Sequence, residues 1–257
     1  MSVLKFFSKH WEHLVLSILG TTISILLTFG VNKMIGKSKQ QADRRLAAVR
    51  VMSNIEAYAR QLDRVHDHTM SADTMANYIS LHQHELDKFS EQTLLQFVLT
   101  SAPDVMITYD NSAEQIFTSS FDIWRNVDNA RFIDVAGQSF HTMSIYTEEF
   151  NKWINAFIGH ADEFMHNHKA DYASDKDYYI AYLTDPDTLI KLEEVHPQLD
   201  RMRYVAAVLR WNNRQGMQLM KIREEDVMKE VASAEELDPA DPIPDADQYL
   251  TPRPELP

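Results

Sequence analysis

The chain has 257 residues, of which 38 are acidic and 25 are basic, and it contains no cysteine. Residues 1–51 hold 8 basic and 2 acidic side chains, whereas the remaining residues hold 17 basic and 36 acidic ones, a net charge of −19. This acidic remainder argues against nucleic acid as a partner, because neutralising phosphates requires clustered lysine and arginine. The absence of cysteine excludes a thiol nucleophile and a thiolate zinc site. With only six glycines the composition favours helix, so we expect an all-α protein.

Residues 14–31 form a run of 18 residues without a charge, LVLSILGTTISILLTFGV. This length is close to the roughly 20 apolar residues that cross a bilayer. A cleaved signal peptide is the main alternative, but its apolar region is usually about 7 to 15 residues long and ends in small residues that are missing here. We therefore predict a short N-terminal tail over residues 1–13 and a transmembrane helix over residues 14–34, with the lipid bilayer as a partner.

Charged and aromatic residues flank the predicted span. Two lysines precede it and six basic residues follow it in the comparable stretch, so the positive-inside rule places the large C-terminal part in the cytoplasm. The basic collar is expected to be attracted to anionic lipid headgroups. The residues expected at the membrane interface are Trp11, Lys33, Lys37, Lys39, Arg44 and Arg45.

Two patterns predict self-association. Gly20, Ser24 and Thr28 recur every four residues in the predicted span, and small residues at this spacing let two membrane helices approach closely. Apolar residues then recur at spacings of three and four from Ala48 to Val65, which predicts an amphipathic helix in the juxtamembrane segment 35–66. That helix fits either packing within the chain or a short parallel coiled coil. From both patterns together we expect a parallel homodimer.

The segment 67–236 is predicted to fold as an antiparallel helical bundle. Caps and apolar periodicity place helices at 72–83 after Ser71, at 116–124 after a Ser112–Gln115 capping box, at 129–168, from Asp185-Pro186 to about His196, and at 198–234. The short fourth helix should end before Pro197, because a proline disfavours α geometry in the preceding residue. Residues 237–257 hold six prolines and four aspartates, which predicts a disordered tail.

Histidine supplies the candidate metal site. The sequence has three His-x-His pairs, but residues two apart on a regular helix point about 200° from each other. The two histidines of such a pair therefore cannot bind the same ion. Glu163/His166 and Glu193/His196 instead have the Glu-x-x-His spacing, which puts a carboxylate and an imidazole on one helix face. Two such motifs with glutamates from other helices form the iron or manganese dimetal site of ferritin-like bundles. The glutamates available for this purpose are Glu56, Glu85 and Glu148.

Three segments resemble a family of uncharacterised bacterial single-span membrane proteins. They are FGVNKMIGKSKQQADRRL, TYDNSAEQIFTSSFDIWRNVDNARFIDV and YVAAVLRWNNRQGMQLMKIREEDVMKEV. The resemblance covers most of the chain as a pattern. It implies a bacterial inner membrane location, one N-terminal span and a helical domain, and it implies no activity. The histidine pairs and the Pro-rich acidic tail depart from the pattern.

Catalytic motifs are missing from the sequence. It contains no Gly-rich phosphate loop, no Gly-x-Ser-x-Gly elbow and no His-Glu-x-x-His helix. By elimination we expect a non-enzymatic scaffold, adaptor or sensor at the inner membrane, with an unidentified protein partner and no cofactor. The alternative is a metal-binding bundle that acts as an enzyme or sensor through Glu163, His166, Glu193 and His196.

Overall fold

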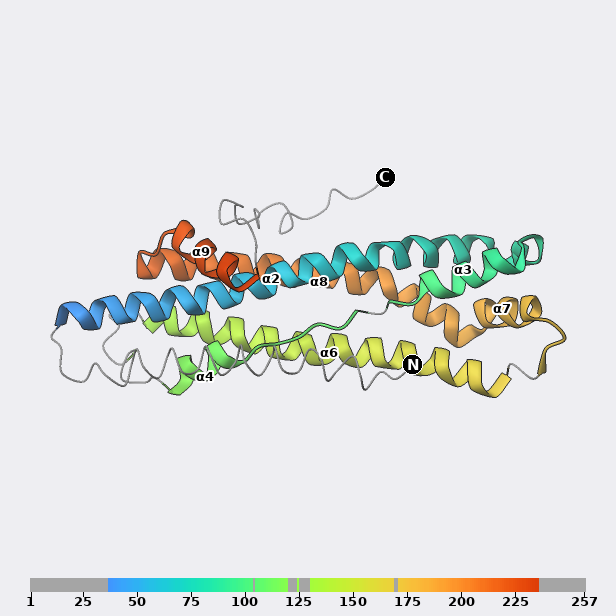
Figure 1. Ribbon diagram of the computed structural model, residues 1–257, viewed down its shortest axis with the longest axis horizontal. Helices are drawn as coiled ribbons and strands as arrows, with labels where there is room; N and C mark the ends of the chain where they lie inside the picture. Colours follow the sequence, from blue (N-terminus) through green and yellow to red (C-terminus); the bar gives the residue numbers. More distant parts are fainter. Residues whose placement is uncertain (1–36, 104, 120–123, 125–129, 169–170, 236–257) are drawn as a thin grey trace. The chain divides into compact units, whose positions relative to one another are not determined.

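The computed structural model describes residues 37–103, 105–119, 124, 130–168 and 171–235. Over these residues the protein is helical without strands, which confirms the predicted all-α class and helical bundle (Figure 1). No helix within these ranges is both long and apolar enough to cross a membrane. The following predictions lie outside the described residues: the transmembrane helix 14–34, the tails 1–13 and 237–257, and the residues Trp11, Gly20, Ser24, Thr28 and Lys33.

The chain divides into two compact units, each assembled from stretches distant in sequence. Of the described residues, unit 1 holds those in 37–54, 110–137 and 215–235, and unit 2 holds those in 55–109 and 138–214. The described elements are α2 (Lys37–His82), the 3-10 helix η2 (Gln83–Lys88), α3 (Glu91–Ser101), α4 (Ser112–Ser119), α6 (Ala130–His168), α7 (Asp175–Thr184), α8 (Pro186–Met220) and α9 (Glu224–Glu235).

Unit 1 combines the beginning of α2 with α4, the beginning of α6, the end of α8 and α9. Its core contains three aromatic rings: Phe117 and Trp124 lie 5.2 Å apart between centroids, and Trp124 and Phe132 lie 5.4 Å apart. The buried Ser53 hydroxyl of α2 lies 3.2 Å from the Val227 carbonyl of α9, to which it donates. Apolar burial thus builds this unit, and the buried hydroxyl is satisfied by a carbonyl.

Unit 2 is a bundle in which long stretches of α2, α6 and α8 pack together. The Tyr58 hydroxyl of α2 donates to the Met143 carbonyl of α6 over 3.1 Å, and Asp63 of α2 pairs with Arg210 of α8. The short elements close one end of this unit, where α7 packs against α3 and η2 (Figure 1). The apolar cluster at this end includes Ile79, Leu86, Leu94, Phe157, Phe164, Tyr182 and Val195.

A non-helical segment between α3 and α4 covers α2 and α6 of unit 2. The Asn151 side chain of α6 accepts from the Ile107 backbone N–H over 2.9 Å and donates to the Ile107 carbonyl over 2.7 Å. The Gln61 side chain of α2 is hydrogen-bonded to Thr108. Because the Ile107 side chain is buried and its backbone is satisfied, the segment forms a wall of the bundle on the α2/α6 side.

Two predicted helix boundaries are wrong because packing overrides the local signal. No new helix begins after Ser71: α2 continues through this residue, whose hydroxyl donates to the His68 carbonyl over 3.3 Å. Pro197 does not end a helix either, since α8 runs through it. A proline inside a helix costs about 3 kcal/mol, and burial of Val195 and Met202 on either side offsets that amount.

The stretch 198–234 is not one helix, as predicted, but is divided between α8 and α9. Lys221 has a φ of 53°, in the left-handed region. The Ile222 N–H donates to the Met217 carbonyl over 2.9 Å and the Lys221 N–H donates to the Gln218 carbonyl over 3.2 Å. These two hydrogen bonds form a Schellman motif, which ends α8 and turns the chain into α9.

Other boundaries agree with the sequence. The predicted helix 129–168 is confirmed as α6, and the periodic apolar row from Ala48 to Val65 is buried along α2. Asp185 caps α8 as predicted, because its carboxylate accepts from the Thr188 N–H over 3.0 Å. Sequence reasoning missed α3 and α7, although Ser90 and Ser174 at their N-caps are the signal that marks such helices.

Candidate functional site

The candidate site is an open groove between α6 and α8 in unit 2. Two hollows lie along it, one bordered by α6 residues 138–142 and α8 residues 208–212, the other by α6 residues 156–163 and α8 residues 187–194. Residues near the start of α6 lie opposite residues near the end of α8, so the two helices run antiparallel here. The two hollows thus lie on the α6/α8 side of unit 2, and the ion-paired Glu149 and Arg201 lie between them along α6 and α8.

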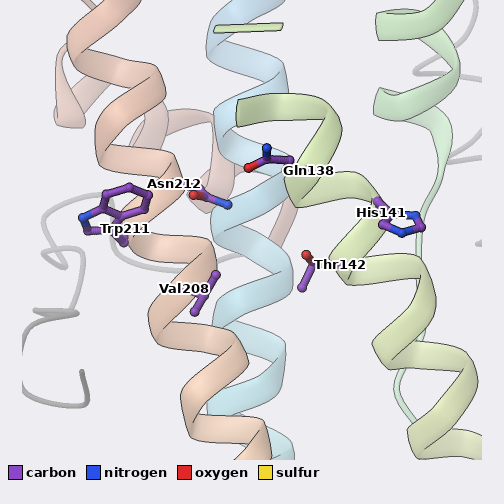
Figure 2. A pocket seen from close by; sticks show the side chains of 6 residues that line it. All are labelled: Gln138, His141, Thr142, Val208, Trp211 and Asn212. Atoms are coloured by element: carbon purple, nitrogen blue, oxygen red, sulfur yellow. The ribbon is translucent and has the colours of Figure 1, made fainter. Parts of the chain in front are cut away.

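A hollow of about 410 Å³ occupies one end of the groove (Figure 2). Its floor contains a satisfied polar contact, in which the buried Asn212 amide donates to the Ser139 hydroxyl over 3.1 Å. Figure 2 shows α6 side chains across from α8 side chains, with His141 and Trp211 at opposite margins. The six residues that line the hollow are Gln138, His141, Thr142, Val208, Trp211 and Asn212.

Large apolar side chains are exposed beside this hollow. Tyr204 lies one turn before Val208 on α8, and Ile145 lies one turn after Thr142 on α6. The exposed fractions of Ile145, Tyr204 and Trp211 are 41%, 59% and 45%. Exposed apolar side chains scattered singly are ordinary, whereas several close to one hollow are a feature of interaction surfaces.

Polar contacts hold α6 and α8 together in the middle of the groove. Glu149 forms an ion pair with Arg201, whose guanidinium carbon lies 5.6 Å from the centroid of the Tyr146 ring. Burial raises the pKa of Tyr146, and its hydroxyl has no hydrogen-bond partner among the described residues. The Tyr146 hydroxyl therefore stays protonated at neutral pH, and its ring serves as a packing surface for the Arg201 cation.

The other end of the groove is acidic. A hollow of about 510 Å³ is bordered there by Glu163, Asp187 and Glu194, with Lys191 and His160 as the basic members of its lining. The Glu194 carboxylate accepts from the Trp153 indole N–H over 3.1 Å. His160 is also held, since its Nε2 lies 2.8 Å from the Thr188 hydroxyl. The groove thus changes from apolar to acidic along its length.

A buried ionic network lies inside unit 2. The Arg210 guanidinium of α8 pairs with both carboxylate oxygens of Asp63, and its Nε lies 3.6 Å from Glu56 Oε1. Arg60 Nε and Asn213 Nδ2 donate to the two oxygens of Glu56, over 3.2 Å and 3.3 Å. Burial raises the pKa of Glu56 in spite of Arg210 and Arg60, so desolvation outweighs the attraction of its partners.

Sequence reasoning missed this network. It considered Glu56 only as a metal ligand, whereas the Glu56 carboxylate contacts two arginines and an asparagine. The polar Asn212-Asn213 pair in an apolar helix was the available signal, because an amide on the buried face of a helix requires a partner.

The structure does not gather the predicted metal ligands into a metal site. No three histidine, aspartate or glutamate side chains in the described part of the chain are grouped so that they could hold a metal ion. Glu163, His166, Glu193 and His196 are all exposed. His196 Nδ1 lies 3.2 Å from Asp73 Oδ2, so its nearest carboxylate is on α2 rather than at Glu193. The described residues therefore offer no support for the dimetal alternative.

The predicted membrane-interface residues fall at the start of α2 where they are described. Lys37 and Lys39 lie in its first turn. Arg44 is half-buried, and Arg45 Nη2 lies 2.8 Å from Asp226 Oδ2 of α9, within unit 1. Hydrogen bonding to Arg223 and Arg45 lowers the pKa of Asp226. Arg45 of the predicted membrane interface therefore forms an ion pair within the protein, with Asp226 of α9.

Comparisons of the chain with protein-family models, with curated proteins and with solved structures find no match.

Proposed function

We propose that the protein is a single-pass, membrane-anchored helical adaptor without catalytic activity, which binds a protein partner along the α6/α8 groove. The observation that carries this proposal is the exposure of Trp211, which lines the hollow, together with that of Ile145 and Tyr204 one turn away along α6 and α8. The uncharged run 14–31 supports the anchor, and the basic residues that follow it support a cytoplasmic helical domain at the bacterial inner membrane. The pattern-level resemblance to bacterial single-span proteins supports the same architecture.

The anchor is tested by alkaline extraction of membranes from cells that produce the full chain. The wild type should stay in the membrane pellet, whereas Leu26→Lys/Leu27→Lys should be released, because each charge near the middle of a span costs about 3 kcal/mol. The matched control places the same two lysines at Met70 and Leu81, both exposed on α2, and should stay in the pellet. Release of the wild type would refute the anchor. Paired reporters fused after Pro257 test the cytoplasmic location of the bundle.

The adaptor role is tested by photocross-linking in cells. Tyr204, exposed in the groove, and Met70, exposed on α2, are each replaced by benzoylphenylalanine. The proposal expects a discrete protein adduct from position 204 that position 70 does not give. Equal labelling from both positions, or none from position 204, would contradict it.

We also propose a parallel homodimer through Gly20, Ser24 and Thr28. Because the chain has no cysteine, single cysteines report this contact cleanly. Ser24→Cys should form a disulfide-linked dimer in the membrane, and Leu26→Cys, about 200° away on a helix, should not. Equal cross-linking at both positions would refute the predicted face.

A further inference from the structure

We propose that the occupant of the α6/α8 groove is an amphipathic α-helix of a partner protein whose apolar face ends in a basic turn. This inference rests on the adaptor function proposed above and names the chemistry of its partner. It follows from the length of the groove, the polarity of its two ends and the charge of unit 2.

The length of the groove favours a helix as its occupant. The two hollows are spaced along α8 over 22 residues, from Ile190 in one to Trp211 in the other, and positions three and four apart share one face of each helix. A helix laid between two helices meets side chains at this spacing on successive turns, which is the geometry of knobs packed into holes. The α2/α6 side of the same unit is already covered by the segment that contains Ile107, whereas the α6/α8 side carries two hollows that a fourth helix could fill.

Small residues allow close approach near the acidic end. Ala156 and Gly159 lie on the α6 edge of the second hollow, and both are exposed. A Cβ added at Gly159 would meet no atom within 4 Å. A docked helix can therefore approach the α6 backbone at this point. A large side chain introduced at Gly159 would fill the space that the docked helix needs, without disturbing the packing of the bundle.

Charge complementarity indicates a basic partner. The first hollow has Ile145, Tyr204 and Trp211 exposed in it or beside it, whereas the second is lined by the exposed Ile190 and by three carboxylates, Glu163, Asp187 and Glu194, against one lysine, Lys191. The segments 55–109 and 138–214 of unit 2 together have 20 acidic and 11 basic side chains. A helix with arginine or lysine in the turn above Glu163 and Asp187 is attracted to this surface, and one with acidic residues there is repelled.

Synthetic helical peptides are the probes for this inference. Each has about 21 residues, matching the length of the groove, and a leucine-alanine face at spacings of three and four. Two carry four arginines, at the N-terminal or at the C-terminal turn, so that both orientations are sampled; two matched peptides carry glutamates instead. Binding is measured by anisotropy of a labelled peptide with the full chain in phosphatidylcholine nanodiscs, after subtraction of empty nanodiscs.

One arginine peptide is expected to bind about tenfold more tightly than its glutamate counterpart, because each of two exposed ion pairs contributes up to about a factor of five. Gly159→Leu should weaken that binding at least as much. Gly137→Leu is the matched control on α6, since a Cβ there also meets no atom within 4 Å, and it should bind like the wild type. Glu163→Lys/Asp187→Lys should reverse the preference between the two peptides.

Three results would overturn the inference. The first is equal binding of the arginine and glutamate peptides, and the second is equal weakening of peptide binding by Gly159→Leu and Gly137→Leu. The third is self-association of the protein that is abolished by Gly159→Leu, because the occupant would then be a second copy of the chain. The adaptor function is judged separately. If position 204 cross-links a partner while no arginine peptide binds, the basic helix is refuted and the adaptor stands; absence of any cross-link refutes the adaptor.

Discussion

Replacing Arg210 by methionine should destabilise the protein far more than replacing an exposed arginine of the same helix. The side chain of Arg210 is 1% exposed and that of Glu56 is 0% exposed, whereas Asp63 is 41% exposed and can be hydrated. Removing the guanidinium leaves Glu56 buried with only Arg60 and Asn213 as partners. Removing one partner of a buried ion pair costs about 3–5 kcal/mol, and the two remaining partners of Glu56 place Arg210→Met near the lower end of that range.

The control is Arg201→Met, on the same helix and of the same chemistry. Arg201 is 48% exposed and pairs with a comparably exposed Glu149, so its loss should cost less than about 1 kcal/mol. The double variant Glu56→Gln/Arg210→Met removes both buried charges. It should recover more than half of the loss, because the cost of the single change arises from the uncompensated carboxylate rather than from the missing attraction.

Urea titration of the full chain in detergent micelles, followed by far-ultraviolet circular dichroism, measures these differences in the free energy of unfolding. The reasoning is refuted if Arg210→Met costs no more than Arg201→Met. It is also refuted if the loss in the double variant equals the sum of the losses in Glu56→Gln and Arg210→Met, since the two groups would then be independent.

Three further predictions concern stability and are measured by the same titration. Gly159→Ala should raise the free energy of unfolding by about 1 kcal/mol, the helix preference of alanine over glycine in open space. Gly216→Ala should give no such gain, because the new Cβ would lie 2.8 Å from Cε of the buried Met52; an equal gain at both sites would contradict the packing described. Burial raises the pKa of Glu56 above 4.5, so the folded protein binds this proton more tightly than the unfolded chain. The stability of the wild type relative to Glu56→Gln should therefore rise as the pH falls from neutral through the raised pKa and level off below 4.5, and a pH-independent difference would refute this. Lys221→Gly should stabilise by about 1 kcal/mol, because glycine adopts the left-handed region without the strain of a Cβ; a loss would argue against the observed φ of 53°.

Helices with a strong apolar period could be predicted from the sequence, and those with weak caps or internal breakers could not. The row from Ala48 to Val65 is buried as its spacing predicts, and α6 has its predicted range within one residue. Local preference alone predicts a helix boundary at both Pro197 and Ser71, because proline disfavours α geometry in the residue before it and serine favours the N-cap position. In the folded protein the burial of residues on both sides of Pro197 outweighs that local preference.

The groove was not predictable because its two edges belong to different helices, whose packing against each other local spacing does not reveal. Tyr204 and Trp211 fall outside the buried row of α8 that contains Met202 and Leu209, and this second apolar row was the available signal. A second row on one helix indicates either more core or a binding surface. Only the packing of α6 against α8 decides which, because it shows that these side chains stay exposed.

The sequence by itself determined the helical class, the uncharged N-terminal run and the division between a basic collar and an acidic remainder. These are properties of composition and local spacing, which act without knowledge of distant contacts. The tertiary structure alone decided that Glu56 meets Arg210 and that α6 and α8 leave a groove with one apolar and one acidic end. Burial and Coulomb attraction depend on distances in space, and residues separated by half the chain acquire those distances only when the helices pack.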